Sequence, residues 1–454
     1  MASCAVAGCV LLAGCMPVAI PDLPDHTPAR WTSTPPEAGT PVDLQQWWKA
    51  LGDPTLDALV AEAVNSNLDL RQATLRLQAA RMVAGTWRSG FLPTIDATAR
   101  PTQDASARDS YYQTGIEAAW EPGLFGSADS ARILALASAG NAESLRNAAQ
   151  VAVVAGVVRS YLDLAVAQAQ LDLRTQEEGL DAGAERMVAT RLRLHLAEPG
   201  EQERVRARHA ASRAGVAQMT EAAGSAARTL ALLLGRDAPD PAWQGIRTLP
   251  QLGAFGVQQV PADLLRHRPE VALAEADVLR AAGEHGQARA ALYPRLRWGG
   301  SIVYSYNITQ NARVHTDSSP SFGPYIDIPL LDWGQRRMRE QAGQKELEAA
   351  LLGYRKAVLE SIAEVEGALA GLDRQQASIT ALHAATEAAD MQVKQQSRRV
   401  ALGLSSDFDG LDLQRSALAT RADLVGAQGM RLLAFVALYR ALGGASPPPM
   451  EPVE

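Results

Sequence analysis

Two stretches of the chain place apolar side chains at alternating intervals of three and four residues, the spacing of a heptad seam along a helix. In the second half the seam runs through Ile362, Val365, Leu369, Leu372, Gln376 and Ile379. In the first half it runs through Val154, Val157, Tyr161, Leu164, Gln168 and Leu171. Matching members differ by 208 positions, as 362 − 154 shows, and a glutamine has the same phase in both seams. The pattern therefore indicates a tandem duplication.

Short landmarks outside the seams repeat at similar offsets. Phe125-Gly126 precedes Trp333-Gly334 by 208 positions, and Leu92-Pro93 precedes Tyr293-Pro294 by 201. The difference of seven residues predicts a longer loop in the second copy than in the first.

Around each seam the helical pattern is unbroken, from about Ser127 to Leu194 and from about Gly334 to Leu402. At 1.5 Å per residue such helices would be on the order of 100 Å long. A sustained repeat of 3.5 residues predicts that they pack against other helices as coiled coils.

Each half also contains a non-helical region, Gly90–Pro122 or Leu292–Leu331, in which two strand-like stretches flank a loop rich in polar residues and proline. The loops are Thr102–Ser110 and Thr309–Ser321. The predicted strands are Phe91–Pro101, Tyr111–Trp120, Leu296–Ile308 and Phe322–Leu330. Tilted strands of about ten residues are long enough to cross an outer membrane.

Four strands cannot satisfy their own edges in lipid, because each unpaired backbone group there costs several kcal/mol. The smallest transmembrane barrels use about eight strands. Two copies of the chain would supply eight strands and three copies twelve, so the sequence predicts an oligomer and leaves both numbers open.

Composition narrows the function classes. The 454 residues are 47% hydrophobic but only 5% aromatic, which suits long helices and disfavours an all-β enzyme. The formal charge of -7 is spread along the helices without a basic block, so no nucleic-acid partner is expected.

All three cysteines, Cys4, Cys9 and Cys15, lie in an apolar start that is too short to span a bilayer and reads as a secretory signal. Leu12-Ala13-Gly14-Cys15 resembles a lipobox, in which the cysteine becomes the acylated N-terminus, and two acyl chains anchor a protein stably. Cys9 also follows a matching tripeptide, but only eight residues precede it. A cytosolic protein with an apolar start is the alternative. The proline-rich stretch from Met16 to Pro41 reads as an extended tether.

Six motifs then carry a family resemblance. They are Trp47-Trp48 with Asp53-Pro54 and Leu56, Asn67-Leu68-Asp69-Leu70, Trp120-Glu121 with Leu124-Phe125-Gly126, Arg268-Pro269-Glu270 with Ala274-Glu275, Pro329-Leu330 with Trp333-Gly334-Gln335-Arg336, and Leu438-Tyr439-Arg440-Ala441-Leu442-Gly443-Gly444. In this order, on a duplicated frame, they resemble the TolC-type outer-membrane efflux factors of the lipidated, OprM/NodT-like branch.

The resemblance implies a mainly α fold with β, in which a trimer forms a twelve-stranded outer-membrane barrel continued by a long α-helical periplasmic barrel. It also implies an equatorial collar, a covalent lipid at Cys15 with no other cofactor, and docking to a periplasmic adaptor (membrane fusion) protein and an inner-membrane pump.

The expected division of the chain follows from these features. It is a signal peptide at 1–14, a lipidated tether and equatorial segment at 15–62, a first repeat at 63–235 with its hairpin at about 90–122, an inter-repeat equatorial segment at 236–264, a second repeat at 265–442 with its hairpin at about 292–331, and a tail at 443–454.

Catalytic or metal-binding patterns are absent from the sequence. No two of the seven histidines have metal-ligand spacing, and there is no phosphate-binding glycine loop or nucleophile elbow. Asp407, Asp409 and Asp412 resemble the start of a calcium loop, but Leu411 and Leu418 stand where oxygen ligands are required.

The same acidic residues follow the end of the second long helix. The family resemblance makes Phe408 a bulky plug and Asp412 an acidic ring member of a periplasmic gate, with Asp409 as a second acidic position and Asp407 beside them. Three copies of each carboxylate around an axis would attract cations. The alternative is a helix N-terminus capped by Ser405, Ser406 and Asp407.

Three functions remain to be compared. The first is a passive, non-enzymatic exit duct for small toxic compounds or drugs. The second is the outer-membrane duct of a type I protein secretion system, and the third is a structural coiled-coil lipoprotein of the envelope. The strands argue against the third, since a spacer needs no lipid-facing β segments.

Overall fold

The structure is a computed structural model, and it describes residues 18–23, 31–33, 40–102, 111–246, 248–253, 255–256, 268–307 and 316–444. The chain divides into two compact units. We call residues 1–26, 75–144 and 272–357 the strand unit, because all the longer strands lie in it. Residues 27–74, 145–271 and 358–454 form the core unit, which holds the main hydrophobic cluster.

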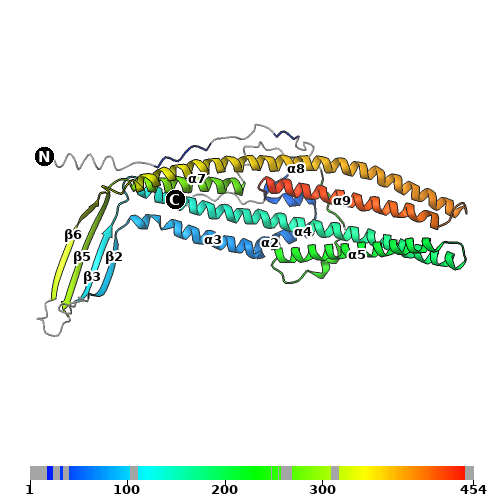
Figure 1. Cartoon of the computed structure of the whole chain (residues 1–454), viewed down its shortest axis with the longest axis horizontal. Coiled ribbons are helices and arrows are strands. Elements are labelled where there is room, and N and C mark those ends of the chain that lie inside the picture. The colour runs from blue at the N-terminus through cyan, green and yellow to red at the C-terminus, as the bar shows by residue number, and fades with distance from the viewer. Residues whose placement is uncertain are drawn as a thin grey trace. The chain divides into compact units, whose positions relative to one another are not determined.

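The strand unit contains one antiparallel sheet of four strands, in the order β2-β3-β5-β6 (Figure 1). The strands are β2 Thr94–Thr102, β3 Tyr111–Trp120, β5 Arg295–Asn307 and β6 Thr316–Asp327. Pairing of β3 with β5 joins the two predicted hairpins into a single sheet. The prediction of four strands is confirmed, and β2 and β6 are the edges.

Two predicted strand boundaries were wrong. The first strand begins at Thr94, because Trp87–Phe91 forms the 3₁₀ helix η2. The fourth runs from Thr316 to Asp327, although a strand was predicted only from Phe322 and a loop before it. The polar run before Phe322 resembles a loop, yet a strand tolerates it where no core covers the sheet. Within the single chain β6 is an edge strand, with one side outside the β5–β6 ladder, and proline is tolerated in such strands.

The two long helices have the predicted extent, since α4 is Ser127–Arg193 and α8 is Gln335–Ala401, each of 67 residues. Shorter helices flank them: η1 Leu44–Leu51, α2 Pro54–Ser66, α3 Leu68–Gly85, α5 Pro199–Leu233, η3 Pro241–Gly245, α7 Pro269–Ala290, η4 Phe408–Gly410 and α9 Leu411–Ala441. Two-residue strands β1 (Thr40–Pro41) and β4 (Phe255–Gly256) pair in parallel.

The backbone repeats the duplication seen in the sequence. Phe125 and Trp333 both have positive φ, at 56° and 57°, and each precedes a glycine with positive φ. His195, after α4, and Gly403, after α8, also share a left-handed conformation at the offset 403 − 195 = 208. A left-handed residue satisfies orphan carbonyls at a helix end. The tandem repeat is therefore confirmed down to the conformation of single turns.

The core of the core unit forms where the two predicted seams meet the segment around Trp47. Trp47 is 1% exposed, and its ring stacks on that of Tyr439 with centroids 5.8 Å apart. Phe435 contacts the same tyrosine ring at 4.6 Å. The first seam is buried from Val154 to Gln168, whereas the second is buried only from Val365 to Leu372. Removing an aromatic side chain from such a core typically costs about 3–5 kcal/mol.

Polar contacts of the resemblance motifs secure this core. Asp53 caps α2 and accepts a hydrogen bond from the Tyr161 hydroxyl on the first seam. Arg268, 3% exposed, donates to the Ser361 carbonyl at 3.2 Å. Gly444 is required because a Cβ there would lie 2.8 Å from both the Trp47 ring and the Tyr439 carbonyl.

In the core unit, one histidine links α4 and α5 through both of its ring nitrogens. His209 Nδ1 lies 2.6 Å from Glu185 Oε2, and Nε2 lies 2.9 Å from Glu178 Oε1. Only an imidazolium can donate to both carboxylates. The bonds to Glu185 and Glu178 raise the pKa of His209 above its ordinary value, and the bond from His209 lowers the pKa of Glu185. Arg206, 3.7 Å from Glu185, is the other charged partner of this pair.

We predict that His209→Gln makes the α4–α5 hairpin insensitive to pH. A raised folded pKa means that the histidine stabilises the hairpin below its unfolded pKa of about 6.5 and that this is lost as pH rises through the folded pKa. Amide exchange of α5 in the native protein should therefore be slower near pH 6 than near pH 9, after correction for intrinsic rates. The variant should lose that difference.

His383→Gln is the matched control, since this histidine is largely exposed and lies 4.0 Å from the Glu387 carboxylate. It should leave the α5 profile unchanged. A pH dependence that survives in His209→Gln would show that other groups set the stability of the hairpin.

Candidate functional site

The sheet of the strand unit has two chemically distinct faces. Directly opposed residues share a face, so the register assigns every described side chain to one of them. The apolar face carries Ile95, Ile116, Trp120, Trp298, Ile302, Tyr304, Phe322 and Ile326. The polar face carries Asp96, Thr98, Arg100, Gln113, Glu117, Arg297, Ser301 and Ser305, with Val303 and Tyr325 as its larger apolar members.

Neither face is covered by a core. On the apolar face Phe322 is 82% exposed and Ile326 is 63% exposed. On the polar face Arg100 pairs with Glu117 at 2.7 Å. An apolar surface of this kind needs lipid, and a charged one needs water. The arrangement is that of a barrel wall between a membrane and an aqueous lumen.

In the described part of the chain, two helical segments are also long and apolar enough to span a bilayer by length and composition, one in α4 and one in residues 408–441. The apolar window of α4 is 61% buried within the protein. Its hydrophobicity is therefore used largely in packing, and the sheet is the better candidate for contact with lipid.

The predicted gate residues lie in the core unit at the turn between α8 and α9. Phe408 packs against a small cluster formed by Val188 of α4 and Val205 of α5. The Arg191 guanidinium lies over the Phe408 ring, 4.9 Å from its centroid. Within one chain this aromatic ring therefore joins the two helical hairpins, a contact that the sequence did not reveal.

Asp409 acts as the cap of its own turn. Its carboxylate accepts from the Ser406 backbone N–H at 3.0 Å, the Ser406 hydroxyl at 2.8 Å and the Ser405 hydroxyl at 3.1 Å. These bonds, the Ser406 N–H first, lower the pKa of Asp409. Asp407 makes no side-chain capping bond. The Ser406 hydroxyl in turn accepts from the Asp409 N–H at 3.3 Å, so Ser406 and Asp409 cap the turn reciprocally. Of the caps considered from the sequence, Ser406 therefore makes a capping bond and Asp407 does not.

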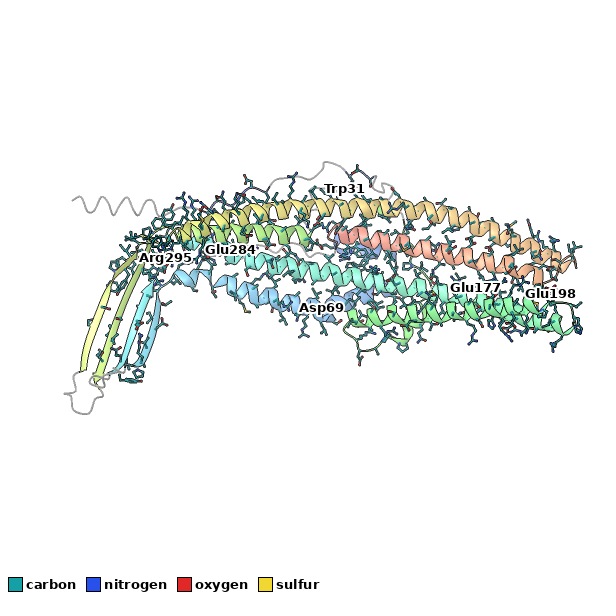
Figure 2. The ribbon with its side chains drawn as sticks, in the orientation of Figure 1. Trp31, Asp69, Glu177, Glu198, Glu284 and Arg295 are labelled. Atoms are coloured by element: carbon teal, nitrogen blue, oxygen red, sulfur yellow. The ribbon has the colours of Figure 1, made fainter. Side chains whose placement is uncertain are left out.

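Asp412 faces α5, where Arg208 Nη1 lies 2.9 Å from its carboxylate. One turn further along α9, Arg415 Nε lies 3.1 Å from Asp181, a carboxylate of α4 that is only 1% exposed. Another Arg415 nitrogen is 3.6 Å from Glu177, which Figure 2 labels along α4. Charged contacts therefore connect the α4–α5 hairpin, whose turn carries Glu198, to the α8–α9 hairpin.

Sequence reasoning identified the acidic residues but missed Arg191, Arg208, Asp181 and Arg415. Their partners come from helices about 200 residues away, and no local spacing reports such pairs. Asp181 stands among other charged residues of α4, so its sequence context gave no signal of its burial.

The predicted lipid site, Cys15, lies outside the described residues, but its neighbour Val18 does not. The Val18 N–H donates to Asp129 Oδ2 at 3.1 Å, in the first turn of α4. Arg132 holds the pKa of Asp129 below its ordinary value, so this acceptor stays ionised. In the core unit, Thr32 and Ser33 donate to the carboxylate of Glu366 on α8. Two described parts of the tether, Val18 and Thr32 with Ser33, are therefore hydrogen-bonded to helices α4 and α8 of the same chain.

Among the described residues, no group of three histidine, cysteine, aspartate or glutamate side chains is placed so that it could hold a metal ion. His195, His209, His285 and His383 belong to that part. His26, His267 and His315 lie outside it.

Comparison with known proteins gives one consistent family. A family model described as outer membrane efflux protein matches residues 59–236 and 260–444. The pyoverdine export outer membrane protein OpmQ of Pseudomonas aeruginosa is 27% identical over 97% of this chain and 96% of its own. Outer membrane protein OprJ of the same species is 28% identical over 89% and 87%. Nodulation protein T of Rhizobium leguminosarum bv. viciae is 27% identical over 89% and 86%.

Solved structures agree. The outer-membrane channel OprN aligns with a TM-score of 0.80 and 26% identity over 95% of this chain and all of its own. The open state of the MtrE channel of Neisseria gonorrhoeae, at 23% identity and a TM-score of 0.77, covers 94% of this chain and 98% of its own and supports the fold. Together with the two-faced sheet, these matches show that the chain belongs to the outer membrane efflux protein family and is a passive channel protein, not an enzyme.

Proposed function

We propose that three copies of this chain close into a twelve-stranded barrel and form the exit duct of a tripartite efflux pump. The observation that carries the proposal is the sheet, which has an exposed apolar face, an exposed polar face and two unpaired edges. In lipid those edges must be paired, so β6 of one copy would pair with β2 of the next.

The number three rests on the family resemblance, since two copies would also reach eight strands. Long helices that continue from each strand pair would then surround the axis below the barrel. Exposed apolar side chains on α8, such as Leu352 and Leu359, would be covered by a neighbouring copy.

The partners of the duct are proposed from the same resemblance: a periplasmic adaptor protein and an inner-membrane pump that supplies the energy. The cargo would be small molecules. Supporting this, two relatives are named for pyoverdine export, in OpmQ, and for solvent efflux, in SrpC of Pseudomonas putida.

The oligomer is tested by native mass measurement of the full-length protein in detergent. We expect a mass of three chains together with single-channel conductance in planar bilayers. A dimer would favour an eight-stranded ring, and a stable monomer with intact β signal would contradict the closure argument.

We further propose that Phe408, Asp409, Asp412 and Asp407 form the periplasmic gate. Three copies of each carboxylate in a narrow ring would attract cations, because like charges a few ångströms apart interact strongly where water is scarce. In this proposal the ring of Phe408 narrows the opening from its place beside Arg191.

We predict that the double variant Asp409→Ala with Asp412→Ala reduces cation selectivity in planar-bilayer recordings. Phe408→Ala should raise the resting conductance, because it removes the ring and its contact with the α4–α5 hairpin. Asp423→Ala, an exposed carboxylate further along α9, is the matched control and should change neither property. If a variant that combines Phe408→Ala, Asp409→Ala and Asp412→Ala kept wild-type conductance and selectivity, the constriction would lie elsewhere in the channel.

The lipid anchor at Cys15 is proposed from the lipobox and from the position of Val18. Three residues reach at most about 10 Å, so an acylated Cys15 would lie within that distance of the first turn of α4. That turn begins seven residues after the end of β3, near the end of the sheet from which the helices start. The anchor would therefore enter the membrane next to the barrel.

Cys15→Ser should abolish acylation, measured as incorporation of labelled fatty acid into the mature protein. Cys9→Ser is the matched control and should leave the label intact. If the label persists in Cys15→Ser and disappears in Cys9→Ser, the acylated residue is Cys9. If the label persists in the variant that lacks both cysteines, the lipoprotein proposal is wrong.

A further inference from the structure

The apolar face of the sheet is hollowed by a cleft of about 310 Å³ at the end where the strands meet the helices. Its floor is the directly opposed pair Ala118 and Gly300, and its walls are the rings of Trp120, Trp298 and Phe322. A Cβ on Gly300 would lie 2.9 Å from the Phe322 ring. The glycine is therefore needed for the ring to stand where it closes one wall.

The lining selects for hydrocarbon. Only the two indole nitrogens among its side chains are polar, and Trp120 Nε1 already donates to the Phe91 carbonyl at 2.8 Å. A polar ligand would lose its bonds to water and find almost no partners here. Because this face is the one exposed to lipid, an occupant would come from the membrane side.

The lipid proposed on Cys15 would be a hydrocarbon source attached to the chain itself. Val18 is fixed to Asp129 at the start of α4. Just before α4, the ring of Phe125 stacks on that of Tyr293 with centroids 5.0 Å apart. Tyr293 precedes Trp298 by five residues, which is about 17 Å of extended strand.

The lipid proposed on Cys15 and the residues that join it to Val18 have a length similar to this path from Val18 to Trp298. The three residues from Val18 back to Cys15 span up to about 10 Å. An acyl chain adds about 15 Å, half of the hydrocarbon thickness of roughly 30 Å. Together they reach about 25 Å from Val18, which is comparable to the length of the path through Phe125, Tyr293 and Trp298.

We propose that an acyl chain of the lipid on Cys15 lies in the cleft between Trp120, Trp298 and Phe322. This rests on the proposed lipidation. The anchor would then bind the wall of its own channel as well as the bilayer, and would hold the start of the tether at the level where the sheet ends.

The test is photocrosslinking in cells fed a fatty acid that carries a diazirine near its end. After irradiation the full-length protein is purified and digested with trypsin, and crosslinks are mapped by mass spectrometry. We expect the N-terminal acyl peptide joined to the peptide that begins at Trp298. Ala118→Phe, which fills the cleft, should reduce this product several-fold. Ala97→Phe should leave the amount of this product unchanged, because Ala97, on β2, lies on the same face of the sheet as Ala118 but does not line the cleft.

Cys15→Ser separates the possible occupants. If a membrane phospholipid fills the cleft, the peptide that begins at Trp298 stays labelled in this variant, and the proposal is overturned. If Cys15 is acylated but its crosslinks do not include that peptide, the proposal that the acyl chain lies in the cleft is wrong and the proposed lipidation is retained. If the Cys15 peptide of the wild type carries no acyl mass, both proposals are wrong.

Discussion

The requirement that every backbone N–H and C=O be paired in lipid governs the rest of this structure. A four-stranded sheet with edges β2 and β6 cannot meet it alone. A globular protein would cover such a sheet with helices, but here the apolar face stays exposed while the charged residues gather on the other face. The unpaired edges and the exposed apolar face of the single chain are therefore explained only by contact with further copies and with a membrane.

Duplication explains how one chain supplies both strands and helices in matched sets. The left-handed turns recur at 125 and 333 and at 195 and 403, and α4 and α8 begin and end at equivalent positions. The copies have diverged where their environments differ. Gln168 on the first seam is buried and donates to the Trp243 carbonyl, whereas Gln376 on the second is exposed.

The sequence predicted those features that local periodicity encodes, including the ends of α4 and α8 to within about one residue. It placed the start of β6 wrongly, because the first six residues of β6 have the polar and proline-containing composition of a loop. At the gate it identified Phe408, Asp409 and Asp412 but not the cations beside them. Heptad spacing reports which face of a helix is buried, and it does not report which residue of a distant helix lies opposite.

The contacts at the two turns divide into two kinds with different energetic roles. The buried Asp181 carboxylate lost its hydration on folding, and this loss partly offsets the favourable free energy of its attraction to Arg415. A rearrangement that hydrates both ions therefore need not cost much free energy. Phe408 gains from leaving water and would lose that gain if its hairpin moved away from Val188 and Val205. At the two turns the ion pairs therefore fix the register of one hairpin on the other, while the aromatic contact adds apolar burial that keeps the turns together. In the proposed gate, a tip built this way would change its opening without unfolding, because only a small apolar cluster would have to separate.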